Sequence, residues 1–266
     1  MITKFDYKEN FFQSVGKPHS GKNFILDKGV PFFIYREYLR SLHSYIHLIK
    51  LGWTTWSLID NTEFSAKIDL AKSYNIPICL GGTLFEIAYD QGSYDNLLDF
   101  IVANGISCIE IASGFAVSIS QLPIAIEKAS NRSLIIMVEV GYKDEDKDNS
   151  LTNKERISHI KQALACGAHY VILEAREKGI GYSVFKKDQQ RNSNLIGMIA
   201  SEVGFDKIVF EAPDRNSQIF LVNMINSNVN IGNVSFDEIS RLETIRRRIH
   251  ADTYKKEGGS NEQNCN

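Results

Sequence analysis

The chain has little cysteine, little proline and almost no net charge, and each shortage excludes a class of protein. Its 266 residues include four cysteines and five prolines, and the formal net charge is −2. The scattered cysteines match neither a disulfide framework nor a zinc site. A balanced charge creates no field that would attract nucleic acid or an anionic membrane. We therefore expect neither of these partners.

Long apolar runs are also missing. No run approaches the roughly 20 residues that cross a bilayer, and residues 1–22 lack the basic start and apolar stretch of a secretory signal. The sequence therefore predicts a cytoplasmic protein without a membrane span. One basic triplet, Arg246-Arg247-Arg248, is interpreted as a solvated helix face or a subunit contact and not as a basic patch, because three arginines in one helical turn point in different directions.

Several catalytic signatures are absent as well. The chain has no G-x-S-x-G elbow and no glycine-rich phosphate motif. Its six histidines fall before, between or away from the polar strand ends described below. A histidine-based acyl-transfer site therefore has little support.

Eight short apolar runs rich in Ile, Val and Phe recur along the chain, and segments with helical periodicity separate them. The runs start about 21 to 37 residues apart, which is close to the size of a βα unit. The runs are Asn23–Gly29, Ile46–Thr55, Ile76–Thr83, Ser107–Gly114, Leu134–Gly141, Tyr170–Arg176, Lys207–Pro213 and Asn228–Val234.

Helix signals lie between these runs. Asp95–Ala103 ends at Asn104-Gly105, Thr152–Ala165 opens with a capping-box pattern, and Asp237–His250 would supply the last helix. Strands that alternate with helices predict a parallel sheet with crossover helices. An open doubly wound sheet shows the same alternation.

The ends of the runs favour a closed barrel over an open sheet. Nearly every run begins apolar and finishes in a charged or amide residue. The C-terminal rim of a barrel collects such residues from all eight strands around one cavity, whereas an open sheet collects only those beside its switch point. We predict a (β/α)₈ barrel over residues 23–254, an N-terminal arm or cap over 1–22 and a disordered tail over 255–266.

Both signs of charge occur at the strand ends. Each carboxylate could simply pair with a neighbouring cation. Burying many ions is costly, however, so we interpret the set as one that coordinates something. Carboxylates on successive strands could bind Mg²⁺, the cations could bind a carboxylate or phosphate, and a desolvated lysine, Lys28 or Lys50, could form a Schiff base. The charged residues are Glu110, Glu139, Glu174, Glu211, Lys28, Lys50, Lys143 and Arg176.

Two strand ends with glycine are candidates for binding an anion through the backbone. Gly81-Gly82-Thr83 follows the third run, although two glycines at a strand end more often permit only a tight turn. Gly232-Asn233 closes the eighth run and is better placed, because barrels commonly bind phosphate near the loops after strands seven and eight.

At these strand ends the sequence resembles the phosphosulfolactate synthase family. The resemblance covers residues 23 to 254, and GGTLFE followed by EVG and FEAP is its most specific part. The resembling stretches are LDKG at 26–29, KLGW at 50–53, GGTLFE at 81–86, EVGYKDEDKD at 139–148, GAHYVILEARE at 167–177, IVFEAP at 208–213, VNIGN at 229–233 and LETIRR at 242–247.

The resemblance implies a Mg²⁺-dependent (β/α)₈ barrel that adds sulfite to phosphoenolpyruvate by a Michael-type addition, giving 2-phospho-3-sulfolactate. It also implies a homo-oligomer, and a role in coenzyme M synthesis or sulfolactate formation. The family's proton donor corresponds to Lys143. We assign Lys143, Lys28 and Lys50 to catalysis, Glu110, Glu139 and Glu174 to the metal, and Glu86, Arg176, Glu177, Glu211, Gly232 and Asn233 to substrate binding.

The chain departs from the family pattern at four positions. Ser113 replaces an Asp after the fourth run, and Ala175, Lys178 and Ile180 alter the stretch after the sixth. Such changes at the rim would alter how a doubly charged substrate is held. Two alternatives therefore stay open: a related barrel enzyme that adds another nucleophile to an enolpyruvate-type substrate, and a non-catalytic, stress-associated paralogue.

Overall fold

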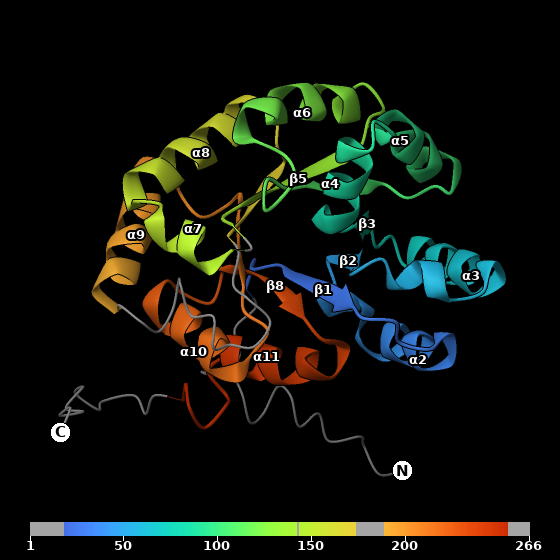
Figure 1. Cartoon of the computed structure of the whole chain (residues 1–266). Helices are drawn as coiled ribbons and strands as arrows, with labels where there is room; N and C mark the ends of the chain where they lie inside the picture. Colours follow the sequence, from blue (N-terminus) through green and yellow to red (C-terminus); the bar gives the residue numbers. More distant parts are fainter. Residues whose placement is uncertain (1–18, 143, 174–188, 255–266) are drawn as a thin grey trace, which may run out of the picture.

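The strands of the protein close into a barrel, which confirms the predicted (β/α)₈ fold. A computed structural model of the chain describes residues 19–142, 144–173 and 189–254. Each strand pairs in parallel with the next, and the last pairs with the first. Figure 1 looks into the barrel, with the helices forming a ring around it. The strands are β1 (Asn23–Asp27), β2 (Leu48–Leu51), β3 (Ile78–Leu80), β4 (Cys108–Ile111), β5 (Ile135–Val140), β6 (Tyr170–Leu173), β7 (Ile208–Glu211) and β8 (Asn230–Val234).

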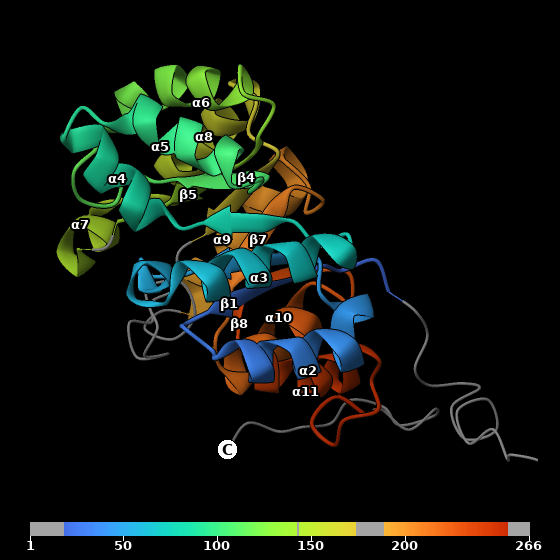
Figure 2. The ribbon, with the colours of Figure 1, turned by 90° about the vertical axis from the view of Figure 1, so that its right-hand side faces the viewer.

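The helices lie in the segments between the strands. Helices α2, α10 and α11 cover one side of the barrel and α4, α5 and α6 the opposite side (Figure 2). No helix within the described ranges combines the length and the apolar character that a membrane span requires. The helices are α2 (Phe32–Leu42), α3 (Asn61–Ser73), α4 (Gly82–Asp90), α5 (Tyr94–Ala103), α6 (Leu122–Ser130), α7 (Glu145–Ser150), α8 (Asn153–Ala165), α9 (Gln189–Glu202), α10 (Arg215–Met224) and α11 (Ile239–Arg246).

Helix α8 begins where the sequence predicts. The Thr152 hydroxyl accepts a hydrogen bond from the backbone N–H of Glu155 at 3.2 Å, and the Glu155 carboxylate accepts one from the N–H of Thr152 at 2.7 Å. This reciprocal capping box satisfies donors that the first turn of a helix leaves without partners. The predicted last helix is shorter than expected, because a short 3₁₀ turn, η4 (Phe236–Glu238), precedes α11.

Side chains of the strands alternate between two cores. In β1, Phe24 packs inside the barrel and Ile25 packs against the helices, because successive side chains of a strand point to opposite faces. The next inward position on any strand therefore comes two residues later. The inner core consists of Phe24, Leu48, Cys79, Cys108, Met137, Ile172 and Val209.

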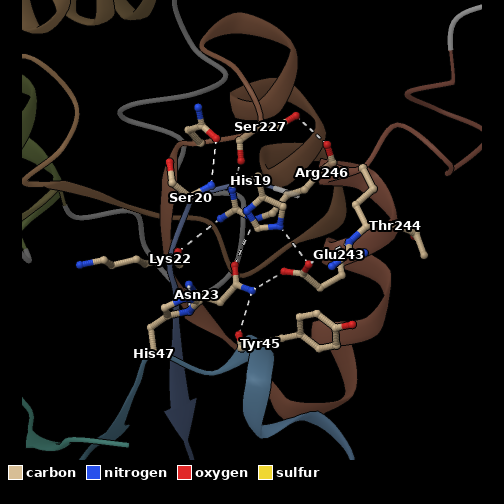
Figure 3. A network of polar contacts seen from close by, with 12 residues as sticks. His19, Ser20, Lys22, Asn23, Tyr45, His47, Ser227, Glu243, Thr244 and Arg246 are labelled. Carbon is tan, nitrogen blue, oxygen red and sulfur yellow. Dashed lines mark hydrogen bonds and ion pairs between the residues drawn. The ribbon is translucent and has the colours of Figure 1, made fainter. Parts of the chain in front are cut away.

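A buried polar network closes the N-terminal end of the barrel (Figure 3). Glu243 of α11 accepts hydrogen bonds from Asn23 of β1 at 2.8 Å and binds the His19 ring at 2.9 Å. Arg246 donates to Asn23 at 3.1 Å and to the carbonyls of Ser227 and Val229 at 2.7 and 2.6 Å. Helix α11 is thereby tied to β1 and to the segment that leads into β8.

Arg246 is the structural centre of this network. Its side chain is 1% exposed, and burial lowers the pKa of the guanidinium to about 10 although Glu243 opposes this shift. A Cβ at Gly21 would lie 2.5 Å from an Arg246 guanidinium nitrogen, so this close approach requires glycine. The interpretation of the arginine triplet as a solvated face or a subunit contact is therefore wrong for Arg246. Arg247 and Arg248 are half-buried.

We expect Arg246→Met to lower the free energy of unfolding by about 3–5 kcal/mol, because several buried acceptors lose their charged donor and each such loss costs about 1–3 kcal/mol. The variant leaves the Asn23 side-chain oxygen and the carbonyls of Ser227 and Val229 without this donor. Urea unfolding of parent and variant at pH 7 measures the difference. Arg132→Met removes a half-buried surface arginine that pairs with the exposed carboxylates of Asp95 and Asp99, and it should cost much less. Equal losses in the two variants would contradict a structural role for the network.

Candidate active site

Charged side chains meet inside the barrel at the C-terminal ends of the strands. Each lies two residues beyond a side chain of the inner core, so the alternation of the strands brings them to the same side of the sheet. All are buried or half-buried. These residues, which we call the mouth cluster, are Lys50 of β2, Glu110 of β4, Glu139 of β5 and Glu211 of β7.

Lys50 holds the mouth cluster together. Its ammonium donates to Glu110 at 2.8 Å and to Glu211 at 3.3 Å, and so links β2 with β4 and with β7. The first of these pairs bypasses β3. Gly81 lies directly after β3, next to this pair, and a Cβ there would be in ordinary van der Waals contact with both Lys50 and Glu110, at 3.8 Å from each.

The second carboxylate oxygen of Glu110 faces the start of helix α4. It accepts a hydrogen bond from the backbone N–H of Gly82 at 2.8 Å. The N-terminus of a helix favours a negative charge because its first N–H groups point outward. A Cβ at Gly82 would come within 2.7 Å of the Ala112 Cβ, so this contact depends on glycine. The N–H of Gly82 therefore binds a carboxylate of the protein itself. In the anion site considered at Gly81-Gly82-Thr83, this donor is already occupied by Glu110.

The mouth cluster keeps Lys50 protonated. Burial alone lowers the pKa of its ammonium, but Glu110, Glu211 and Glu139 outweigh burial and raise the pKa well above its usual value. A Schiff base needs a neutral amine. The suggestion that Lys50 could form one is therefore not supported, and the geometry gives Lys50 the role of a fixed positive charge.

The mouth cluster carries more negative than positive charge. Three carboxylates face one ammonium, which leaves a formal excess of two negative charges. Carboxylate oxygens with such an excess are a suitable donor set for a hard divalent cation. Within the described ranges no three His, Cys, Asp or Glu side chains lie close enough to hold a metal. The predicted ligand Glu174 falls outside these ranges, and Glu110 is shared between Lys50 and Gly82.

The end of β8 brings an amide next to the mouth cluster. Asn233 has a φ of +56°, and the β1–β8 pairing shifts register beside it, which marks a bulge. Its side-chain oxygen is buried and has no hydrogen-bond partner among the described residues. Gly232 and Asn233 line a cavity of about 10 Å³ together with Lys50, Glu110 and Glu211. Only a water molecule fits this space, so the cavity is too small for a substrate.

Glu86 fixes the loop after β4. It lies on α4, is fully buried, and accepts backbone N–H bonds from this loop. The donors are Gly114 at 3.1 Å, Phe115 at 2.8 Å, Ala116 at 2.7 Å and Val117 at 3.3 Å. The predicted role of Glu86 in substrate binding stays a prediction.

Two further buried ion pairs fix rim loops, and the sequence analysis did not identify them. Asp27 binds Lys67 at 2.7 Å and accepts N–H bonds from Gly29 and Val30. Asp148 binds Arg156 at 2.7 Å and accepts the N–H of Tyr142 at 3.0 Å. A signal for them exists, since each cation shares the core-facing stripe of its helix, Lys67 with Phe64, Ile68 and Ala71, and Arg156 with Ile157, Ile160 and Ala163.

The remaining predicted residues divide into two groups. Lys28 is exposed directly after β1, at the same rim as the mouth cluster, and its ammonium lies 4.9 Å from the centre of the Trp53 ring. The other predicted residues lie outside the described ranges. They are Lys143, Glu174, Arg176 and Glu177.

The fold and the mouth cluster define the class of protein. A closed parallel barrel with polar residues gathered at its C-terminal face is a (β/α)₈-barrel enzyme, since active sites of this fold lie at that face. The family model described as (2R)-phospho-3-sulfolactate synthase (ComA) matches residues 13–252. The chain belongs to this family, as its sequence motifs predict.

Individual proteins agree with this assignment. The chain is 37% identical to phosphosulfolactate synthase of Methanocaldococcus jannaschii over 237 residues, which cover 89% of this chain and 94% of that protein. It is 30% identical to the Methanothermobacter thermautotrophicus enzyme of the same name over 254 residues, 93% of this chain and 98% of that one. The structure of 3-hexulose-6-phosphate synthase from Salmonella typhimurium shares the fold alone, with a TM-score of 0.55, 10% identity, and coverage of 86% and 100%.

We expect the stability of a Lys50→Met variant to depend on pH. Without the ammonium, the crowded glutamates have folded-state pKa values above the unfolded value of about 4.3. Their contribution to stability is then present below that pH and is lost as the pH rises through the folded pKa. In the parent the Lys50 pKa is raised, so its contribution is fully present across pH 5–8. The melting temperature of the variant should therefore fall further below that of the parent at pH 8 than at pH 5.

The double variant Lys50→Met/Glu110→Gln is the matched control for this measurement. It removes one negative charge together with the positive one, and it should recover part of the loss at pH 8. A constant difference between Lys50→Met and parent from pH 5 to pH 8 would mean that Lys50 acts through packing and not through its charge.

Proposed function

We propose that the chain is a phosphosulfolactate synthase that adds sulfite to phosphoenolpyruvate. The observation that carries this proposal is the family match over residues 13–252, which spans the strands that supply the mouth cluster. The sulfur of sulfite forms a bond to C3 of phosphoenolpyruvate, the C2–C3 double bond becomes a single bond, and C2 takes up a proton. The product is 2-phospho-3-sulfolactate.

The protein's own groups supply the electrostatics of this reaction. Negative charge develops on the substrate carboxylate when the sulfur attacks, and a fixed cation beside that position stabilises it. Lys50 is such a cation, because its ammonium is buried, oriented by two carboxylates and kept protonated. Gly232 and Asn233 border the mouth on the β8 side, where we place the phosphate together with the cations Lys28 and Arg176. Glu177 stays a predicted substrate-binding residue, without a contact to the phosphate.

The excess of carboxylates in the mouth cluster supports the binding of Mg²⁺. We propose Glu139 and Glu174, with Glu110 through its remaining lone pairs, as the residues that hold it. Bound there, Mg²⁺ supplies a Lewis acid for the substrate carboxylate. Glu211 contacts Lys50 and so helps to set the position of the ammonium that faces the substrate.

Two properties of the protein stay predictions. We propose a homo-oligomer in the cytoplasm, with the family resemblance supporting the oligomer and the sequence composition supporting the compartment. Gel filtration with light scattering measures the first.

The proposed function predicts that the purified chain consumes phosphoenolpyruvate only when sulfite and Mg²⁺ are both present. Coupled detection of phosphoenolpyruvate, with the sulfonate product identified by mass spectrometry, measures this. Chelation of the metal should abolish turnover, and added Mg²⁺ should restore it. Consumption of phosphoenolpyruvate with a nucleophile other than sulfite would identify the chain as a related enzyme that uses a different nucleophile. A folded protein without any turnover would show a non-catalytic paralogue.

Lys143 is our proposed donor of the proton to C2. We expect Lys143→Ala to lower kcat by roughly 10²–10⁴, the usual contribution of a positioned acid, and to change KM for phosphoenolpyruvate much less. Lys143→Arg keeps the charge but cannot release its proton near neutral pH, so it should stay slow. Steady-state kinetics at saturating sulfite measure both variants. An arginine variant with a kcat close to that of the parent would eliminate Lys143 as the proton donor.

A further inference from the structure

Lys28 and Trp53 form a pair at the rim of the barrel, beside the mouth cluster. Lys28 follows β1, and Trp53 comes two residues after the end of β2, the strand that pairs with β1. The Lys28 ammonium lies 4.9 Å from the centre of the Trp53 ring, within the range of a cation–π interaction. Trp53 is 46% exposed, although a large apolar side chain gains most from burial. Packing alone therefore does not explain this position of the indole.

The backbone around Trp53 adopts a conformation that bulky residues avoid. Trp53 has a φ of +52° and Thr54 one of +57°, so two successive residues without glycine's freedom occupy the left-handed region. Such conformations persist only where surrounding contacts impose them, and they cluster at functional sites. The strained backbone therefore indicates a function for the Trp53 side chain.

Contacts on both sides of Trp53 hold the loop in this conformation. The N–H of Gly52 donates to the carbonyl of Asp27 at 3.0 Å, and the N–H and hydroxyl of Thr55 donate to the carbonyl of Gly52 at 3.0 and 2.8 Å. A Cβ at Gly52 would lie 2.5 Å from the Cδ1 atom of Leu26, so a larger residue there would require the Leu26 side chain to move. The loop after β2 is thereby locked to the end of β1, and Trp53 is carried to Lys28.

Lys28 contacts the Trp53 ring and also lines a cavity at the rim. The cavity has a volume of about 230 Å³, and its lining includes Tyr38 of α2 together with Ser235 and Asp237 from the segment after β8. An aromatic face attracts a cation and so restricts where the ammonium can lie. The Trp53 ring thereby orients the Lys28 ammonium beside this cavity.

We propose that Trp53 is a positioning residue that holds the Lys28 ammonium at the mouth, where it binds the anionic end of the substrate. The inference rests on the proposed function in taking phosphoenolpyruvate as that substrate. Trp53 acts through Lys28 and does not take part in bond formation. Its removal should therefore weaken substrate binding and leave the chemical step nearly unchanged.

Intrinsic fluorescence reports on this pair directly, because the chain has two tryptophans. Trp56 packs on Phe64 and Phe100, so Trp56→Phe keeps an aromatic ring there and leaves Trp53 as the only tryptophan, which excitation at 295 nm selects over the tyrosines. Titration of this variant with phosphoenolpyruvate should change the Trp53 emission, and adding Lys28→Gln should weaken the apparent affinity. Inorganic phosphate as a second titrant shows whether the phosphate group suffices. An emission that does not respond to phosphoenolpyruvate would overturn the proposal.

Kinetics of Trp53 variants test the coupling. We expect Trp53→Leu to raise KM for phosphoenolpyruvate about 3- to 30-fold, the range that cation–π energies give, with kcat changed less than about twofold. Trp53→Phe keeps an aromatic face and should retain most of the affinity. In a Lys28→Gln background, Trp53→Leu should have no further effect, because the residue acts through the lysine.

Phe33→Leu is the matched control. Phe33 is an exposed ring on α2 with the Arg36 guanidinium 5.0 Å from its centre, and it lies outside the mouth cluster. Its KM should equal that of the parent. Additive effects of Trp53→Leu and Lys28→Gln, or a fall in kcat at constant KM, would refute the positioning role. If the parent shows no sulfite-dependent turnover, the proposed function fails, and the fluorescence titration still decides whether Trp53 and Lys28 bind the anion.

Discussion

Lys50 is a largely buried ammonium whose carboxylate partners come from other strands of the barrel, and the pairs that it makes with Glu110 and Glu211 determine much of the surrounding structure. The other oxygen of Glu110 accepts a hydrogen bond from the N–H of Gly82, where a Cβ would lie 2.7 Å from the Cβ of Ala112. Glycine at position 82 is therefore explained by the way in which this ion pair is held. Fixed dipoles and charges of this kind stabilise a transition state without having to reorganise during the reaction.

The loops around the mouth are also held by buried charges, although these charges lie outside the mouth cluster. Asp27, Glu86 and Asp148 each place a buried carboxylate against backbone N–H groups of a rim loop. A carboxylate that accepts several N–H bonds forms strong, charge-assisted contacts and leaves the loop few alternative conformations. Each of the three fixes a loop at the rim, and fixed rim loops keep a site within the narrow geometry that catalysis needs.

The sequence predicts the barrel and the inward charges because both depend on short-range periodicity. An alternation of two along each strand is enough to place Lys50 and Glu110 on the inner side. The partners could not be predicted in the same way, since Lys50 pairs in register with Cys79 and reaches Glu110 only across the neighbouring strand. Glu86 could be predicted only in part. Its motif marks it as a site residue, but the backbone N–H bonds that it accepts depend on the path of the loop after β4.

The two ends of the barrel use buried charge for different purposes. At the N-terminal end, Glu243 binds Asn23 and His19 and lies near Arg246. The Arg246 guanidinium donates its hydrogen bonds to backbone carbonyls and to a side-chain amide. The opposite charges of Glu243 and Arg246 balance in this network, although His19 Nδ1 has no hydrogen-bond partner among the described residues. At the mouth, three carboxylates share one ammonium, and the Asn233 oxygen has no partner among the described residues. Excess buried charge is costly, so the uncompensated negative charge distinguishes the mouth from the opposite end and suits it to binding a cation.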